Sequence, residues 1–72
     1  MKENTVSNIC NILKECEVRD FKEKAIELLE KVPKEKRFEI FFDIKKQLYQ
    51  EAIIYLDKEL SLYEVRKKLE II

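Results

Sequence analysis

The hydrophobic positions of the chain recur with the spacing of amphipathic helices, beginning near the N-terminus. The first such segment places five side chains on one face: Val6, Ile9, Cys10, Leu13 and Cys16. This pattern predicts a helix over about residues 5–17. A second apolar stripe begins at Phe21 and ends at Val32, which predicts a helix over about 21–32. Asp20 and Glu23 have the spacing of a capping box at its start.

Pro33 separates this second helix from the most hydrophobic part of the chain. Proline lacks a backbone N–H and disfavours the helical conformation at the residue before it, so it predicts a short, tight break. The third helix then extends over about 34–58, and its apolar residues between Phe38 and Leu60 cover roughly 180° of its circumference at 100° per residue. A helix that lies on one neighbour needs a narrower stripe, so other helices must pack around this one.

Ser61 and Glu64 form another candidate capping box, which predicts a short fourth helix over about 62–71. Alternatively the third and fourth helices form one continuous rod, because no glycine or proline forces a break between them. The predicted fold is all-α: a single domain, residues 1–72, made of a small bundle of three to four helices with a long central third helix (5–17, 21–32, 34–58 and 62–71).

Some residues of the long helix lie outside its main apolar arc. Ile40 and Ile54 project from the back, with Gln47 between them at heptad spacing and Glu51 and Lys58 alongside. We call these five residues the rear seam. Either it docks a partner helix or a second copy of the chain, or its isoleucines are scattered surface residues of the kind that folded proteins tolerate.

Lys45 projects into the middle of the apolar arc, and Glu59 points into the same arc. Along a continuous helix the two lie about 21 Å apart, too far for an ion pair within one chain. They could approach each other in an antiparallel dimer of long helices. The alternative is that the stem of Lys45 lies on apolar surface while its ammonium reaches water.

Composition excludes several classes of function. Lysine plus arginine equals aspartate plus glutamate at 15 each, which removes the global attraction that most nucleic-acid binders show and makes nucleic acid a minority interpretation. The chain contains neither glycine nor histidine, so it has no glycine-rich phosphate loop and no imidazole base or ligand. We therefore expect no enzymatic activity, no cofactor and no metal site.

The two cysteines, Cys10 and Cys16, match neither a metal motif nor a secreted disulfide framework, and we expect both to be buried, reduced thiols. The N-terminal segment is amphipathic and contains neither a signal-peptide core nor a membrane span. Together these observations predict a cytoplasmic protein without a membrane contact.

The densest positive charge surrounds Pro33 and consists of Lys31, Lys34, Lys36 and Arg37. This basic turn could bind an acidic partner or phosphate groups. Alternatively it is a solvated turn whose cations complement the C-terminal dipole of the second helix.

From these patterns we expect a small helical protein–protein interaction module: a regulator, inhibitor or adaptor that acts through the aromatic-rich long helix as a homodimer. The candidate partner-binding residues are Ile40, Gln47, Glu51, Ile54, Lys58 and Lys45. Alternative functions are a nucleic-acid-associated factor that uses the basic turn, or a structural subunit of a larger assembly. The sequence identifies neither the partner nor the biological process.

Overall fold

The computed structural model describes the backbone of residues 2–71 and the side chains of residues 5–71. Within them the chain forms four helices and no strand: α1 (Lys2–Glu15), α2 (Val18–Glu30), α3 (Lys34–Gln50) and α4 (Leu56–Lys68). The all-α prediction is confirmed, and α3, with 17 residues, is the longest of the four. None of these helices has both the length and the apolarity needed to cross a bilayer.

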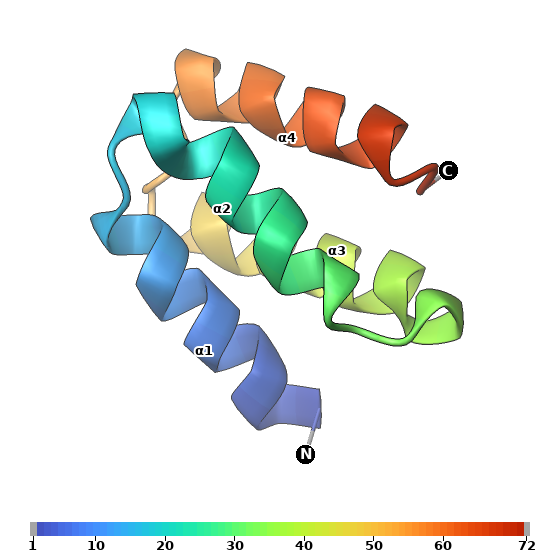
Figure 1. Cartoon of the computed structure of the whole chain (residues 1–72). Coiled ribbons are helices and arrows are strands. Elements are labelled where there is room, and N and C mark those ends of the chain that lie inside the picture. The colour runs from blue at the N-terminus through green and yellow to red at the C-terminus, as the bar shows by residue number, and fades with distance from the viewer. Residues whose placement is uncertain (1, 72) are drawn as a thin grey trace.

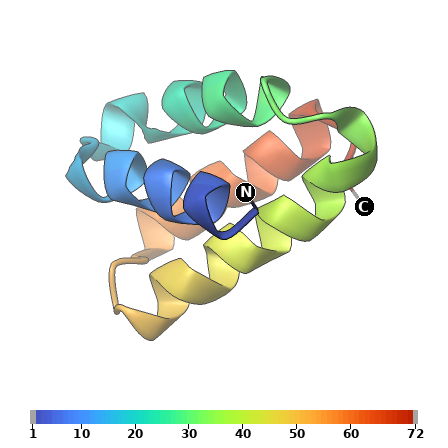
Figure 2. The same ribbon diagram turned by 90° about the horizontal axis from the view of Figure 1, so that it is seen from below.

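The helices form two layers, each made of an antiparallel pair. The first layer contains α1 and α2, and the second contains α3 and α4 (Figures 1 and 2). Across the layers, α1 packs mainly against α3 and α2 packs mainly against α4. The inner face of the α3–α4 pair is therefore covered by the first layer, while its outer face has no covering element within the described residues.

The core lies between these layers and takes side chains from all four helices. Phe21 of α2 and Phe41 of α3 are its largest members, and both are almost completely buried. The other buried apolar residues are Val6, Ile9, Cys10, Leu13, Ala25, Leu29, Val32, Ile40, Ile44, Leu48, Leu62, Val65 and Ile71. The apolar stripes predicted for the first two helices supply much of this core.

The break at Pro33 is confirmed, since α2 ends at Glu30 and α3 begins at Lys34 with Pro33 at its N-cap position. The predicted starts of the first two helices are too late, however. The first begins at Lys2, and the second begins at Val18 with Glu17 at the N-cap. Asp20 lies in the first turn of α2, and no side chain bonds to the cap, so the capping box predicted there is wrong.

A separate fourth helix is present, but the break before it comes earlier than the sequence predicts. The third helix ends at Gln50, and Ala52 adopts a left-handed conformation with φ 56°. The N–H of Ile53 then donates to the carbonyl of Leu48 at 3.1 Å, which is the backbone pattern of a Schellman motif. The predicted bounds 34–58 are therefore wrong, because the chain reverses direction within residues 51–55.

The fourth helix begins at Leu56 rather than at residue 62, with Tyr55 at its N-cap. Ser61 is inside this helix and donates its hydroxyl to the carbonyl of Asp57 at 3.1 Å, so its predicted role as a cap is wrong. The helix ends as α3 does, with Glu70 left-handed at φ 58° and the N–H of Ile71 bonded to the carbonyl of Arg66 at 2.8 Å.

Candidate functional site

The rear seam does not form a continuous surface on one helix. Ile40 is 4% exposed and belongs to the core, and Ile54 lies beyond the end of α3, where it is half-buried against that core. Lys58, in the first turn of α4, is 6% exposed, and its ammonium nitrogen lies 5.3 Å from the ring centroid of Phe21. All three side chains pack against other parts of the same chain. Because α3 ends at Gln50, Ile54 and Lys58 do not continue the helix face that carries Ile40, and the three form no common surface for a partner.

Gln47 and Glu51, the polar members of the rear seam, join α3 to α1. The Glu51 carboxylate pairs with the ammonium of Lys14 at 2.5 Å and accepts a hydrogen bond from the Gln47 amide at 3.0 Å. These two hydrogen bonds, that from Lys14 first, lower the pKa of the Glu51 carboxyl below its ordinary value. The network fixes the C-terminal ends of α1 and α3 together.

The basic turn divides into two kinds of residue. Lys31, Lys34 and Lys36 are exposed, whereas the Arg37 guanidinium bonds to the last carbonyls of α2. It donates to the carbonyl of Leu29 at 2.9 Å, to that of Glu30 at 3.3 Å and to that of Val32 at 3.0 Å. Arg37 therefore caps the C-terminus of α2, where the helix leaves carbonyl groups unpaired.

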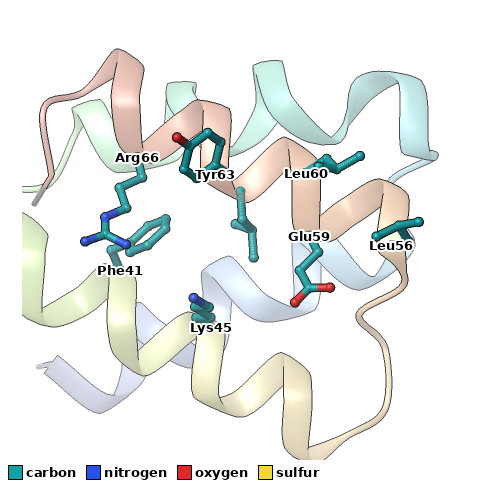
Figure 3. Close-up of a pocket in the computed structure, with 8 residues that line it drawn as sticks. Phe41, Lys45, Leu56, Glu59, Leu60, Tyr63 and Arg66 are labelled. Carbon is teal, nitrogen blue, oxygen red and sulfur yellow. The ribbon is translucent and has the colours of Figure 1, made fainter.

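An open groove of about 310 Å³ lies between α3 and α4. Across these two helices, which are described in full, no Cα of one comes within 8 Å of a Cα of the other. Helices in direct contact have axes about 8–10 Å apart, so this pair is splayed. Eight residues line the groove (Figure 3): Phe41, Lys45, Leu56, Glu59, Leu60, Leu62, Tyr63 and Arg66. We call this feature the outer groove.

Large apolar side chains stand exposed along the α4 wall of the outer groove. Leu56, Leu60 and Tyr63 are 70%, 56% and 58% exposed and recur at positions i, i+4 and i+7. Phe38 and Tyr49 of α3 are also exposed, but they lie outside the lining of the groove. A row of exposed apolar side chains along one helix is typical of an interaction site.

Cationic side chains lie against three aromatic rings of α3 and α4, those of Phe42, Tyr49 and Tyr63. The Lys45 ammonium nitrogen is 5.9 Å from the ring centroid of Phe42 and 6.0 Å from that of Tyr49. The guanidinium carbon of Arg66 is 5.5 Å from the Phe42 centroid, and Lys67 lies 5.5 Å from the Tyr63 ring. Cation–π attraction at these distances orients the charged groups without removing their charge.

The one carboxylate that lines the outer groove belongs to Glu59, and it accepts a hydrogen bond from the Tyr49 hydroxyl. This bond, with a smaller contribution from desolvation, raises the pKa of Tyr49 above its ordinary value. Lys45 and Glu59 both point into the space between the helices (Figure 3). Their separation along a continuous helix was the reason to expect an antiparallel dimer contact. The break at residues 51–55 brings both to one groove of a single chain instead.

Of the candidate partner-binding residues, only Lys45 lines the outer groove; its α4 wall was not predicted as a site. The chain contains a signal for the true bounds of α4. Asp57 and Glu59 occupy the first turn, while Arg66, Lys67 and Lys68 occupy the last turn. Acidic residues favour a helix N-terminus and basic residues a C-terminus, so this charge order could have located the helix.

Cys10 is fully buried, and its sulfur lies 3.8 Å from the carbonyl oxygen of Ile44. Burial in particular raises the pKa of its thiol from 9.0 to about 11. Cys16 is half-buried, and both cysteines are free thiols. Within residues 5–71, no cluster of three or more histidine, cysteine, aspartate or glutamate side chains is placed to hold a metal ion.

Comparisons with protein-family models, with curated proteins and with solved structures found no match to this chain. The outer groove and its charges are therefore the basis for a proposal about function.

Proposed function

We propose that the chain is a protein–protein interaction module that binds the apolar face of a partner helix in its outer groove. The observation that carries this proposal is the exposure of Leu56, Leu60 and Tyr63 along one wall of an open hollow. Binding removes this apolar surface from water, at roughly 25 cal/mol for each Å² buried. Aromatic side chains such as Tyr63 are typical anchors of such interfaces.

The shape of the groove favours a helix as the bound element. Two splayed helices leave a channel between them, and a third helix can fill it with side chains at positions i, i+3 or i+4, and i+7. The lining residues of α4 run from Leu56 to Arg66, about 15 Å along the helix axis. A partner helix of about three turns has matching length. We place this activity in a small cytoplasmic regulator, inhibitor or adaptor, because both thiols stay reduced in that compartment.

Affinity capture from cells of the native host tests this proposal with two matched variants. Leu60→Glu places a charge in the wall of the groove, whereas Ile12→Glu places the same charge at an exposed apolar position of α1. Both side chains are exposed, so circular dichroism should show both variants folded. We expect proteins captured by the unaltered chain to be lost with Leu60→Glu and kept with Ile12→Glu. Equal capture by all three proteins would rule out the groove as the binding site.

Self-association through the outer groove is a second candidate, favoured by the exposed side chains of Leu56, Leu60 and Tyr63, which a second copy of the chain can also cover. Sedimentation equilibrium at up to high micromolar concentration measures it directly. A dimer that dissociates with Leu60→Glu would support this candidate, and a monomer throughout would exclude it.

A further inference from the structure

The outer groove carries an excess of positive charge at its polar positions. Lys45 and Arg66 line it, and Lys67 lies against the ring of Tyr63 on its wall. Glu59 is the opposing carboxylate, and it is already bonded to the Tyr49 hydroxyl. A ligand in the groove therefore meets more cations than anions.

Two further cations lie in the first turns of α3. A smaller hollow of about 200 Å³ there is lined by Lys34, Arg37 and Phe38 together with Leu69, Glu70 and Ile71, so it contains two cations and one carboxylate. Phe42 connects the two hollows, because its ring lies 4.8 Å from that of Phe38 and 5.5 Å from the guanidinium carbon of Arg66. Lys34 and Arg37, members of the basic turn, thus extend the cationic surface of the outer groove.

The α1–α2 turn carries a local cluster of negative charge. The hollow at this turn is lined by five carboxylates and one ammonium group: Glu15, Glu17, Asp20, Glu23, Glu27 and Lys24. The cations of the outer groove and the carboxylates of this turn are local clusters, because each layer as a whole is nearly neutral. An acidic partner is attracted to the outer groove and repelled by the α1–α2 turn, which orients its approach.

We infer that the occupant of the outer groove is an acidic amphipathic helix of a partner protein, with leucine-like or aromatic side chains on one face and carboxylates on either side. The inference rests on the proposed function and adds the chemistry of the partner. Its apolar face contacts Leu56, Leu60 and Tyr63, and its carboxylates pair with Lys45, Arg66 and Lys67. These cations keep their charge beside the aromatic rings and are oriented before the partner arrives.

Other occupants fit this surface less well. Glu59 lines the groove and repels phosphate, and the chain as a whole has no excess of positive charge, which disfavours a nucleic-acid strand. A second copy of the chain would have to present acidic and apolar residues together. The α1–α2 turn does so only in part, because beside its carboxylates it exposes Ile12 and Val18 rather than an apolar stripe at helical spacing.

Three synthetic helical peptides of about 14 residues test the inference by fluorescence anisotropy with the full chain. All three share one apolar stripe, and their polar faces carry glutamate, glutamine or lysine. We expect the glutamate peptide to bind about tenfold more tightly than the glutamine peptide, because exposed ion pairs contribute modestly and three are available. The lysine peptide should bind most weakly. At about 0.5 M salt the three affinities should converge, since screening weakens exposed pairs.

The peptide experiment distinguishes a failure of the acidic-partner inference from a failure of the proposed function. Equal affinities at low salt would overturn the acidic partner and keep the proposed function. No binding of any peptide up to about 1 mM would overturn both. Tighter binding of a single-stranded oligonucleotide than of the glutamate peptide would also overturn the inference, as would competition by self-association of the chain.

Charge variants locate the effect. Lys67→Glu and Lys45→Gln should each weaken the glutamate peptide about threefold to tenfold and leave the glutamine peptide within about twofold. Lys36→Glu is the matched control, because Lys36 is exposed and lies on the opposite side of α3 from Lys45 at 100° per residue. An equal effect of Lys36→Glu would mean that net charge, rather than the outer groove, sets the preference.

Discussion

Replacing Ala52 with glycine should stabilise the protein, although glycine usually weakens a helical chain. Ala52 holds a left-handed backbone conformation with φ 56°, at the turn that separates α3 from α4. In an L-residue the Cβ atom is crowded by the following carbonyl oxygen in this conformation, whereas glycine adopts it freely. The substitution removes that strain at the turn where the chain reverses.

The size of the effect is the difference between two terms. The left-handed conformation costs a non-glycine residue about 1–2 kcal/mol. Glycine also gives the unfolded chain more conformational freedom, which lowers the free energy of unfolding by about 0.5–1 kcal/mol. Ala52 is exposed, so its methyl group contributes little to the core. The free energy of unfolding should rise by about 0.5–1 kcal/mol, which raises Tm by roughly 3–6 °C for a chain of this size.

Urea unfolding followed by circular dichroism measures this change, with Gln50→Gly as the matched control. Gln50 is the last residue of α3, in a right-handed conformation, so glycine there should lower stability by about 0.5–1 kcal/mol. Glu70→Gly, at φ 58°, should stabilise like Ala52→Gly. A loss of stability in Ala52→Gly equal to that in Gln50→Gly would mean that the helix continues through residue 52. The outer groove requires the break, so this result would refute the groove as well.

Three further predictions concern the core and the cap of α2. Arg37→Lys should lower the free energy of unfolding by about 1–3 kcal/mol, because a lysine ammonium cannot replace the three hydrogen bonds that the Arg37 guanidinium donates to backbone carbonyls. As a control, Lys36→Ala should change the free energy of unfolding by less than about 0.5 kcal/mol. At neutral pH Cys16 should react with a thiol reagent while Cys10 reacts only on unfolding. Above pH 9 the Cys10 thiol loses its proton in the unfolded chain, whereas the folded chain keeps this proton up to about pH 11. The free energy of unfolding should therefore fall as the pH rises from 9 to about 11. It should fall less in Cys10→Ala. Ile40→Ala should cost about 2–5 kcal/mol in urea unfolding, as expected of a core residue; a cost below 1 kcal/mol would place Ile40 at the surface.

Hydrophobic spacing was sufficient to predict the buried faces of α1 and α2, because each lies on one side of a regular helix. Local capping signals were less reliable. Asp20 and Ser61 both have sequence contexts typical of an N-cap. Tertiary packing nevertheless begins α2 three residues and α4 six residues earlier than predicted, at Val18 and Leu56. A helix end depends on which residues the core can bury, and a cap contributes only about 1 kcal/mol.

The candidate site was harder to predict than the fold because it depends on one break. No glycine marks Ala52, so nothing in the local sequence announces a left-handed residue there. A continuous helix through residue 58, as the sequence predicts, would put Lys45 and Glu59 far apart and would place Ile40 and Ile54 on one surface. Once the chain reverses at residue 52, Lys45 and Glu59 line a single groove, while Ile40 is buried in the core and Ile54 packs half-buried against it.

The central claim is that the outer groove binds an acidic amphipathic helix, and NMR shift mapping tests it most directly. The glutamate peptide is titrated into the isotopically labelled chain while the backbone amide signals are followed. We expect the largest shifts at Lys45, Leu60 and Tyr63, with Ile12 and Val18 of the other layer unchanged. Shifts centred on Ile12 and Val18, or none at millimolar peptide, would contradict the account.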